Sequence, residues 1–289
     1  MAPIRIVTDS TADIPEEMRL AAGIAMVPLS VNFGNESLRD RIDITPEEFV
    51  RRLKASGRAL PTTAQPPPGL FEETYRRLAD EGAEQIVSIH LSEKLSGTCG
   101  SARIAAAEVA KRVKVEVVDS RSLSLGLGFM ALEAARAADA GGDLATVTAA
   151  IQKMMPNIHI IFFPDTLEYL QKGGRIGRAA MIAGSILSLK PLMRLDEGVV
   201  VPHERTRTRS KAIDGLVKFA KDFPHIRQLS ALKIGDSDME TLLDRLATIF
   251  PSERIIVIDT SPVIGVHLGP GTLGVIIDVT EGALPTTNG

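Results

Sequence analysis

The sequence predicts an α/β protein of two domains, an N-terminal doubly wound parallel sheet followed by a mixed sheet flanked by helices. Three observations predict this fold. Short β-branched runs alternate with helical segments through the first half of the chain. Three of these runs are almost continuously apolar, which is typical of strands buried on both faces of a parallel sheet. In the second half, Asp196, Glu197 and Gly198 separate two apolar runs, which is a hairpin signal.

Helices of the first half begin and end at residues with recognisable capping roles. Thr45 precedes one helix as its N-cap, and Asp143 does the same for the last helix of this half, which ends at Pro156. We therefore expect two domains, residues 1–156 and residues 157–289. The expected strands of the first half cover residues 4–10, 23–31, 85–91 and 113–120, and its expected helices cover residues 45–57, 68–82, 100–112, 128–142 and 144–155. Strands and helices that alternate at this spacing form right-handed βαβ units.

The second half is expected to form a mixed sheet covered by helices. Its expected strands cover residues 158–163, 191–195, 199–206, 228–237, 254–261 and 272–279, and its expected helices cover residues 166–174, 179–187 and 239–250. The basic run "HERTRTRSK", residues 203–211, is interpreted as a solvated strand end and helix start, although a surface for a partner protein is the alternative.

Composition excludes several functional classes. The 289 residues carry a net charge of −3 with a pI near 6.0, which gives no general attraction to nucleic acid or to an anionic membrane surface. Cys99 is the only cysteine, so no intramolecular disulfide forms, as in proteins of a reducing compartment. No run approaches about 18 apolar residues and no export signal opens the sequence, so we expect a cytoplasmic protein without stable membrane insertion.

Polar loops follow three of the expected strands of the first half. Residues 8–13, 92–101 and 119–128 are rich in serine, threonine, aspartate and glycine. In an open α/β sheet, ligands bind beyond the carboxyl ends of the strands, where these loops lie. The middle loop places Ser96 and Gly97 directly before a helix, whose first backbone N–H groups are free to face an anion. Helix capping and turn formation are the alternative interpretation of all three loops.

Three further segments carry candidate binding residues. Prolines stiffen the segment "LPTTAQPPPG", residues 60–69, and hold Thr62 and Thr63 in a fixed orientation, unless the segment is only a rigid linker. Arg175 follows paired glycines in "LEYLQKGGRIGR", where a helix C-cap with surface basic residues is the alternative. His267 lies in a glycine-rich turn before the final strand, and packing alone explains such a histidine poorly.

Most enzyme motifs are missing from the sequence. It contains no G-x-x-x-x-G-K-[ST] motif, no H-E-x-x-H motif and no paired cysteines, which excludes a Walker A nucleotide site and argues against a zinc site. Residues 126–131 match G-x-G-x-x-A but do not directly follow the preceding strand, so we reject a dinucleotide site there. A serine hydrolase or acyltransferase with Ser96 as nucleophile and His267 as base stays open, with Asp9 or Asp119 as the acid.

Taken together, the motifs resemble the DegV family of bacterial fatty-acid-binding proteins along almost the whole chain. The matching segments are "IVTDSTADIP", "VPLSV", "PTTAQPPPGLF", "LSGTCGSA", "VVDSRSLSLGLG", "LEYLQKGGRI", "KPLMRLDEG" and "HLGPGTLG". The resemblance implies a two-domain α/β protein that buries one fatty acid, with its carboxylate at the interdomain cleft. Ala64 and Pro67 stand where the family usually has serines, so secondary hydrogen bonds to the head group are not carried over.

The resemblance also implies roles for individual residues. Thr63 and Ser96 hydrogen-bond the carboxylate, assisted by the N–H group of Gly97. His267 and Arg175 line the same cleft. The candidate ligand-binding set is completed by Thr62, Thr98 and Ser120. The implied function is that of a carrier without catalytic residues, cofactor or metal, which presents the bound carboxylate to a separate ATP-dependent fatty acid kinase that makes an acyl phosphate for phospholipid synthesis.

Elementary energetics fit a fatty acid as ligand. The carboxylate accepts up to three hydrogen bonds here, each worth roughly 1.5–3 kcal/mol for a charged acceptor. A C16 tail buries about 15 carbons at about 0.8 kcal/mol each, on the order of 12 kcal/mol before association costs. The tail therefore supplies most of the affinity. The segment "MIAGSILSLKPLM", residues 181–193, is mostly aliphatic and suits either a tunnel wall or an ordinary core. A sugar or phosphate binder that uses the same loops is a third hypothesis, and it requires a polar cleft.

Overall fold

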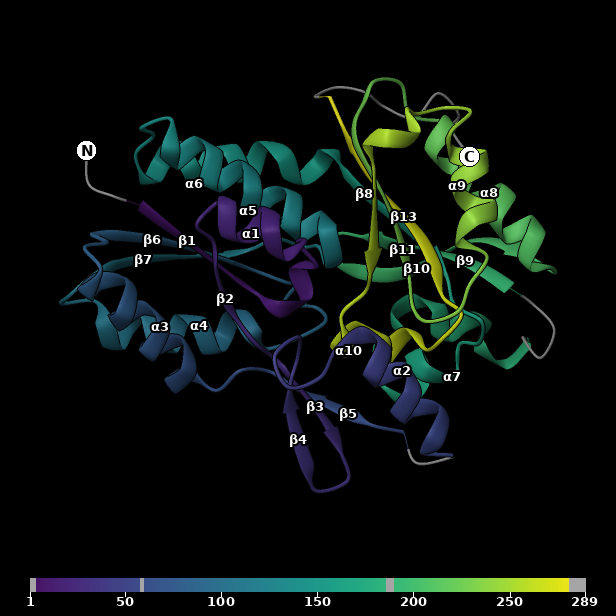
Figure 1. Ribbon diagram of the computed structural model, residues 1–289, viewed down its shortest axis with the longest axis horizontal. Coiled ribbons are helices and arrows are strands. Elements are labelled where there is room, and N and C mark those ends of the chain that lie inside the picture. The colour runs from purple at the N-terminus through teal and green to yellow at the C-terminus, as the bar shows by residue number, and fades with distance from the viewer. Residues whose placement is uncertain (1–3, 58–59, 186–189, 281–289) are drawn as a thin grey trace.

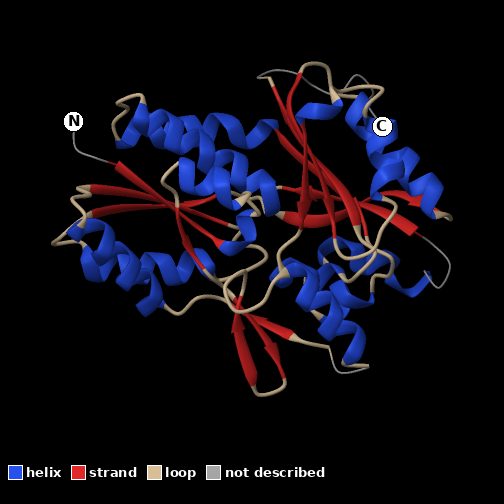
Figure 2. Ribbon diagram, viewed as in Figure 1, coloured by secondary structure: helices blue, strands red, loops and turns tan. Residues whose placement is uncertain are grey.

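The computed structural model describes residues 4–57, 60–185 and 190–280, and its strands form three separate sheets (Figure 1). Figure 2 shows helices arranged around the two larger sheets, with the smallest sheet set apart from them. The end of the helix expected over residues 179–187, and part of the expected tunnel wall over residues 181–193, lie outside the described residues.

The first large sheet is parallel throughout, as the buried apolar runs predict. Its strands are β1 (Ile4–Asp9), β2 (Ala25–Val27), β6 (Gln85–His90) and β7 (Lys114–Asp119), in the order β2-β1-β6-β7. Helices α3 (Pro68–Asp80) and α4 (Thr98–Val109) cover one face, and α5 (Ser124–Asp139) and α6 (Leu144–Met154) cover the other (Figure 1). Helices on both faces make this a doubly wound sheet, which confirms the fold predicted for the first half.

The second large sheet is mixed and follows the order β10-β9-β8-β13-β11-β12. Its strands are β8 (Ile158–Phe163), β9 (Lys190–Asp196), β10 (Val199–Thr206), β11 (Ile226–Lys233), β12 (Ile255–Asp259) and β13 (Leu273–Val279). The predicted hairpin joins β9 to β10, and Glu197 and Gly198 both adopt the positive φ that a two-residue turn of this kind requires. Helices α8 (Arg209–Lys221) and α9 (Met239–Leu246) flank the sheet, so the mixed sheet predicted for the second half is confirmed.

Helix α5 packs against both large sheets and belongs to the main apolar core, which draws residues from both halves of the chain. Two glycines allow this close approach. A Cβ atom on Gly126 would lie 2.9 Å from Cδ1 of Ile160 in β8, and one on Gly128 would lie 2.6 Å from the carbonyl oxygen of Ala12. The glycines within residues 126–131 therefore serve helix packing, which agrees with the rejection of a dinucleotide motif there.

The sequence does not predict the smallest sheet, which is antiparallel. It contains β3 (Ser30–Phe33), β4 (Glu36–Arg39) and β5 (Thr62–Ala64), in the order β4-β3-β5. The prediction of one strand over residues 23–31 is wrong. Pro28 divides this run into β2 and β3, which join different sheets, because proline cannot donate a ladder hydrogen bond. The proline-rich segment likewise contains a paired strand, β5, and is more than an extended loop.

Short helices complete the fold around these sheets. They are η1 (Ser10–Ala12), α1 (Glu16–Ala21), α2 (Pro46–Ala55), η2 (Met155–Asn157), α7 (Glu168–Lys172), η3 (Gly177–Ser185), η4 (Ser252–Arg254) and α10 (Pro262–Leu268). Thr45 and Asp143 cap α2 and α6 as predicted, because each side chain accepts a hydrogen bond from a first-turn N–H group. The glycine-rich turn predicted around His267 is wrong, since His267 belongs to the last turn of α10 and Gly269, at φ 77°, only ends that helix.

The predicted domain boundary between residues 156 and 157 falls directly before β8. It stays a prediction, because one apolar core continues through α5 from the first large sheet to the second. Within the described ranges, no helix has the length and apolar character that crossing a bilayer requires.

Candidate functional site

A cavity of about 310 Å³ lies where elements of both halves meet. Strand β5, helix α10 and the loops after β1, β6 and α7 supply much of its wall. The lining residues are Thr11, Leu29, Thr63, Ala64, Gln65, Leu91, Leu95, Ser96, Leu123, Phe162, Leu170, Arg175, Val200, Val263, Ile264, His267 and Leu268. Most of these side chains are aliphatic and only a few are polar. Such a wall suits a long apolar ligand with one polar end.

Strand β5 turns Thr63 toward the cavity. Its register against β3 pairs Thr63 with Val31, and Thr63 is half-buried while Thr62 and Ala64 on either side are exposed. Successive side chains of a strand point to opposite faces, so the hydroxyl of Thr62 is directed away from that of Thr63.

Helix α10 presents His267 to Thr63. The helix begins after Ser261, whose hydroxyl caps it, and Pro262 occupies its first turn. Near the other end of the helix, Nε2 of His267 lies 2.9 Å from Oγ1 of Thr63. Burial, aided by the positive charge of Arg175, lowers the pKa of His267 to about 4, so the imidazole is neutral near pH 7.

The second ring nitrogen of His267 faces a glycine. Its Nδ1 is buried and has no hydrogen-bond partner in the part of the chain that the structure describes. A Cβ atom on Gly173 would lie 2.3 Å from Nδ1, so a residue with a side chain at position 173 would displace the ring. Gly173 therefore has a packing role that the sequence pattern does not reveal, whereas Gly174 has open space around it and adopts a positive φ of 69°.

The loop after β6 places Ser96 at the start of α4. Oγ of Ser96 lies 2.9 Å from Oγ1 of Thr98, and Ser96 lines the cavity while Thr98 is buried behind it. Gly97 is the N-cap residue of α4 and supplies no side-chain cap. The first N–H groups of the helix therefore lack the acceptor that a serine or aspartate cap provides, and they stay available to an anion.

Backbone carbonyl groups hold Arg175 beside the cavity. Its Nε donates to the carbonyl oxygen of Leu95 at 3.0 Å, and its Nη1 donates to that of Gly173 at 2.7 Å. No carboxylate among residues 4–57, 60–185 and 190–280 forms an ion pair with this guanidinium. Its positive charge is therefore free to attract the anionic end of a ligand.

The structure brings half of the predicted binding residues into one cavity. Those that line it are Thr63, Ser96, Arg175 and His267, and Gly97 adjoins them at the start of α4. The remaining three do not line it: Thr62 is exposed beside Thr63, Thr98 is buried in α4, and Ser120 lines a different groove. The hydroxyl of Ser120 accepts from the N–H group of Ser122 at 3.1 Å, which is a turn contact.

The geometry does not assemble a catalytic triad around Ser96. The base required by that mechanism, His267, bonds Thr63, and its other nitrogen has no acidic partner among the described residues. One candidate acid, Asp119, accepts hydrogen bonds from two backbone N–H groups instead. Among the described residues, no hydrogen bond joins Ser96 to His267 or His267 to Asp119.

The other candidate acid, Asp9, belongs to a buried chain of polar groups. Its Oδ2 lies 3.1 Å from Nδ1 of His90, and Nε2 of His90 lies 2.7 Å from Oγ of Ser88. The hydroxyl of Tyr75 donates to Ser88, and that of Thr11 donates to Oδ1 of Asp9 at 2.5 Å. All five side chains are buried, so this chain ties β1 to β6 and fixes Thr11 at the cavity wall.

Several lining residues are absent from the set that the sequence predicts. Thr11 and Gln65 lie inside the segments marked as binding loops, so their position in those segments is the signal that could have found them. The aliphatic residues, among them Leu29, Leu123 and Val263, come from loops and short elements with the composition of any core. No pattern in the sequence distinguishes them from ordinary packing residues.

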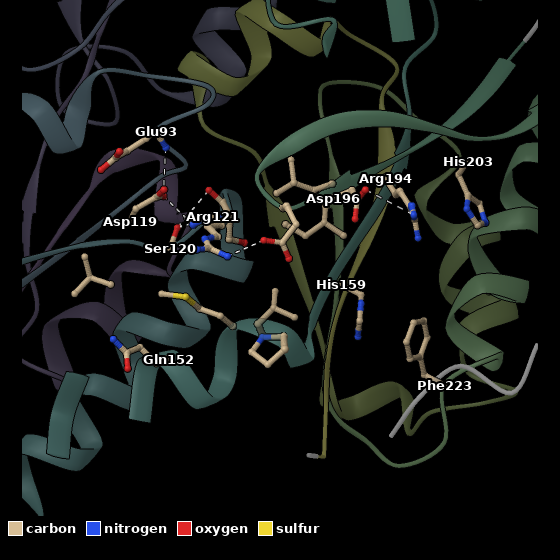
Figure 3. A pocket seen from close by; sticks show the side chains of 18 of the residues that line it. Glu93, Asp119, Ser120, Arg121, Gln152, His159, Arg194, Asp196, His203 and Phe223 are labelled. Carbon is tan, nitrogen blue, oxygen red and sulfur yellow. Dashed lines mark hydrogen bonds and ion pairs between the residues drawn. The ribbon is translucent and has the colours of Figure 1, made fainter. Parts of the chain in front are cut away.

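A second hollow, a groove of about 1160 Å³, is larger and more polar (Figure 3). It lies between β7 on one side and β8, β9 and α8 on the other. Arg121 and Glu197 form an ion pair of 2.7 Å in it, and Arg194 and His203 lie on the opposite side. Across the described ranges, no cluster of three or more histidine, cysteine or acidic side chains has the arrangement to hold a metal ion.

The chain is similar to known proteins over almost its whole length. A family model described as "Uncharacterised protein, DegV family" matches residues 3–279. A DegV domain-containing protein of Streptomyces coelicolor is 40% identical over 284 residues, which cover 95% of this chain and 98% of that protein. Protein DegV of Bacillus subtilis is 34% identical over 278 residues, which cover 94% of this chain and 98% of that protein.

Two solved structures share the arrangement of strands and helices. One is a DegV family protein from Thermus thermophilus, described by its fatty acid binding, with a TM-score of 0.88 and 38% identity over 97% of this chain and 100% of that chain. The other is DegV from Bacillus subtilis, described as a fatty acid binding protein, with a TM-score of 0.86 and 33% identity over the same shares. The likeness therefore extends over both halves of the molecule.

Proposed function

Because this chain belongs to the DegV family, we propose that it binds one long-chain fatty acid in the cavity beside Thr63, Ser96 and His267. The carboxylate accepts hydrogen bonds from the hydroxyls of Thr63 and Ser96 and from the N–H group of Gly97. Arg175 supplies the nearby positive charge. The observation that supports this proposal most directly is a cavity with an aliphatic wall and polar donors grouped on two neighbouring elements, β5 and the start of α4.

The neutral state of His267 suits this role. When the ring proton is on Nε2, the imidazole donates to Oγ1 of Thr63 and leaves the Thr63 proton free to point at the carboxylate. A hydrogen bond to a charged acceptor contributes about 1.5–3 kcal/mol, roughly twice the contribution of a neutral one. His267 therefore orients Thr63, and Thr63 contacts the ligand.

The aliphatic wall provides the larger part of the affinity. Each buried methylene contributes about 0.8 kcal/mol, so a long tail outweighs two or three head-group hydrogen bonds before association costs are counted. The apolar part of the lining contains one phenyl ring, that of Phe162, among aliphatic side chains. A sugar or a free phosphate would make no apolar contact with this wall, which favours a fatty acid over the polar ligands.

We further propose that the bound carboxylate is presented to a separate ATP-dependent kinase in the cytoplasm. The kinase transfers the γ-phosphoryl group of ATP to a carboxylate oxygen, which yields ADP and an acyl phosphate for phospholipid synthesis. This chain binds and orients the acid and supplies no catalytic group. The absence of a Walker A motif from the sequence, and the lack of an acidic partner for His267 among the described residues, are consistent with this division of labour.

Mass spectrometry of the purified protein tests the binding proposal. A native spectrum should show one extra mass equal to a fatty acid, and denaturation should release that acid intact. A covalent acyl group on Ser96, or turnover of an ester, would support the hydrolase instead. Tight inorganic phosphate without lipid would support the polar-ligand hypothesis.

Hydroxylamine trapping tests the partner proposal separately. Protein loaded with oleate should give a hydroxamate, the trapped form of an acyl phosphate, only when ATP and a purified fatty acid kinase are both present. Formation of hydroxamate by this chain and ATP alone would contradict the division of labour.

A further inference from the structure

Gln65 lies at the rim of the cavity and crosses from β5 to α4. Its backbone directly follows β5, and its side chain is exposed to solvent while it also lines the cavity. The amide nitrogen Nε2 donates a hydrogen bond to Oγ of Ser101, 2.9 Å away in the first turn of α4. The side chain therefore bridges the two elements that carry Thr63 and Ser96.

Gly97 makes room for this bridge. The three heavy atoms nearest to a Cβ atom built on Gly97 all belong to the side chain of Gln65, with Oε1 at 2.2 Å. The backbone of Gly97 has φ −79° and ψ 13°, which residues with a side chain also adopt. Glycine at this position is thus explained by the space that the Gln65 side chain occupies, and not by backbone geometry.

The bridge opens by rotation of a side chain alone. Residues 66–68 are prolines, which fix the backbone after Gln65, and a residue that precedes proline is itself restricted to extended conformations. An exposed side chain exchanges rotamers within picoseconds to nanoseconds. The bond to Ser101 joins two neutral groups, so it is of the weaker class of hydrogen bond and breaks readily.

We propose that Gln65 is a gate over the head-group end of the cavity, closed by its bond to Ser101 and opened by rotation away from Gly97. The inference rests on the proposed fatty-acid site, because the gate separates the bound carboxylate from solvent. A closed gate holds the carboxylate against Thr63 and Ser96. An open gate exposes it to exchange and to an enzyme that acts on it. Gln65 is therefore a positioning residue that sets the rate of access to the head group.

The first test needs no lipid and measures how fast iodoacetamide alkylates a thiol at position 96 in delipidated protein. Ser96→Cys provides the thiol, and Cys99 does not compete because it is fully buried and burial raises its pKa. In this background, Gln65→Ala and Gly97→Ala should each speed alkylation about two- to tenfold, the factor that one neutral hydrogen bond supplies. Thr62→Ala truncates an exposed side chain of β5, three residues before Gln65, and should leave the rate unchanged.

A double variant tests whether both changes act through the same side chain. An alanine at position 97 displaces Gln65, and an alanine at position 65 removes it, so the combined variant should label no faster than either single variant. Ser101→Ala removes only the acceptor of the hydrogen bond and should give a part of the same effect. Independent, multiplying effects of the two alanines would contradict the gate.

The second test measures release of cis-parinaric acid, a fluorescent fatty acid, after mixing with excess oleate in a stopped-flow instrument. Gln65→Ala and Gly97→Ala should raise the release rate by the same factor that they raise alkylation. If every variant labels at the parental rate, the gate is wrong whether or not the protein binds lipid. Faster labelling in variants of a protein that does not bind cis-parinaric acid would support the gate but contradict the proposed function. Faster labelling with unchanged release would overturn the role of Gln65 in ligand exchange.

Discussion

The cavity beside His267 and the groove beside His159 both lie between the two halves of the chain, yet they differ in size and chemistry. The groove is almost four times as large, about 1160 Å³ against about 310 Å³. Several of its charged side chains already pair with one another, as Arg121 does with Glu197 and Arg194 does with Asp196 (Figure 3). The cavity instead combines an aliphatic wall with a few polar groups whose hydrogen-bonding capacity is not fully used. One example is Nδ1 of His267, which has no hydrogen-bond partner among the described residues. The site proposed for the ligand is therefore the smaller of the two hollows, chosen by its chemistry and not by its volume.

A comparison of His267 in the cavity with His159 in the groove shows that a shifted pKa alone does not identify a binding residue. Burial lowers the pKa of both His267 and His159 to about 4, with a further contribution from a neighbouring arginine, Arg175 or Arg194. The geometry around them differs. The ring of His159 stacks on Phe223 with centroids 4.3 Å apart, whereas His267 bonds a hydroxyl at the cavity wall. A depressed pKa reports burial, and it does not by itself distinguish the histidine of the proposed site from the one that packs in the groove.

The largest expected effect comes from removing both head-group hydroxyls of the cavity. Thr63→Ala combined with Ser96→Ala should weaken fatty-acid binding by about 100-fold or more, because two hydrogen bonds to a carboxylate are worth about 3 kcal/mol together at the low end. Isothermal titration with oleate measures the change. Circular dichroism should show that the protein stays folded, since both residues are only half-buried.

The matched control uses the two hydroxyls that the structure places outside the cavity. Thr62→Ala combined with Ser120→Ala removes the same two chemical groups, one from the adjacent position of β5 and one from the groove. Oleate affinity should then change by less than about twofold, because neither hydroxyl lines the proposed site. Equal losses of oleate affinity in the two double variants would contradict the assignment of the binding site to the cavity.

A second contrast concerns carboxyl groups. Asp40 is fully buried, and neither of its oxygens has a hydrogen-bond partner in the described structure, whereas Glu197 in the groove is exposed and paired with Arg121. Burial raises the pKa of Asp40 to about 7 from its usual 3.8, against the lowering effect of nearby hydroxyls and of Arg41. Between these two values the folded state binds more protons than the unfolded state, so Asp40 makes the protein less stable as pH rises.

Asp40→Asn should therefore remove part of the pH dependence of stability. Relative to the parent protein, the variant should gain on the order of 2–4 kcal/mol of unfolding free energy between pH 4.5 and pH 8, from a shift of about three pKa units. Urea unfolding at a series of pH values measures this gain. A curve for the Asp40 variant that runs parallel to that of the parent would refute the assignment.

The two large sheets follow from the sequence and the smallest does not, for reasons that lie in particular residues. Strand β13 is an apolar run broken by Gly274 and Asp278, and β8 is one broken by His159, so their burial is visible in composition. Pro28 interrupts an apolar run by a single residue, and only the folded chain shows that β2 and β3 diverge there. Strand β5 has three residues, too few for an alternating pattern to appear.

The polar residues of the candidate site could be predicted from the sequence, whereas its apolar residues could not. Glycine and hydroxyl patterns mark the loops that carry Thr63 and Ser96, and motif resemblance narrows the choice within them. Thr62 and Ser120 share this chemistry, and strand register and loop path alone direct them elsewhere. The tail wall has no signal of its own, because a side chain such as Leu123 has the same composition in a cavity as in a core.

The smallest expected effect on oleate affinity comes from replacing one of the two histidines. It tests whether His267 orients the Thr63 hydroxyl or binds the carboxylate as a cation. His267→Gln should weaken oleate binding about tenfold, because Thr63 loses the group that orients its proton and one hydrogen bond of ordinary strength is lost. His159→Gln should change the affinity less than about twofold, since its ring packs on Phe223 outside the cavity.

In the parent protein, affinity should be constant from pH 6 to pH 8, because a group with a pKa of about 4 stays neutral over that range. An affinity that rises steeply as the pH falls from 8 to 6, and does so only when His267 is present, would mean that an imidazolium ion binds the carboxylate, and Thr63 would lose its place as the principal donor.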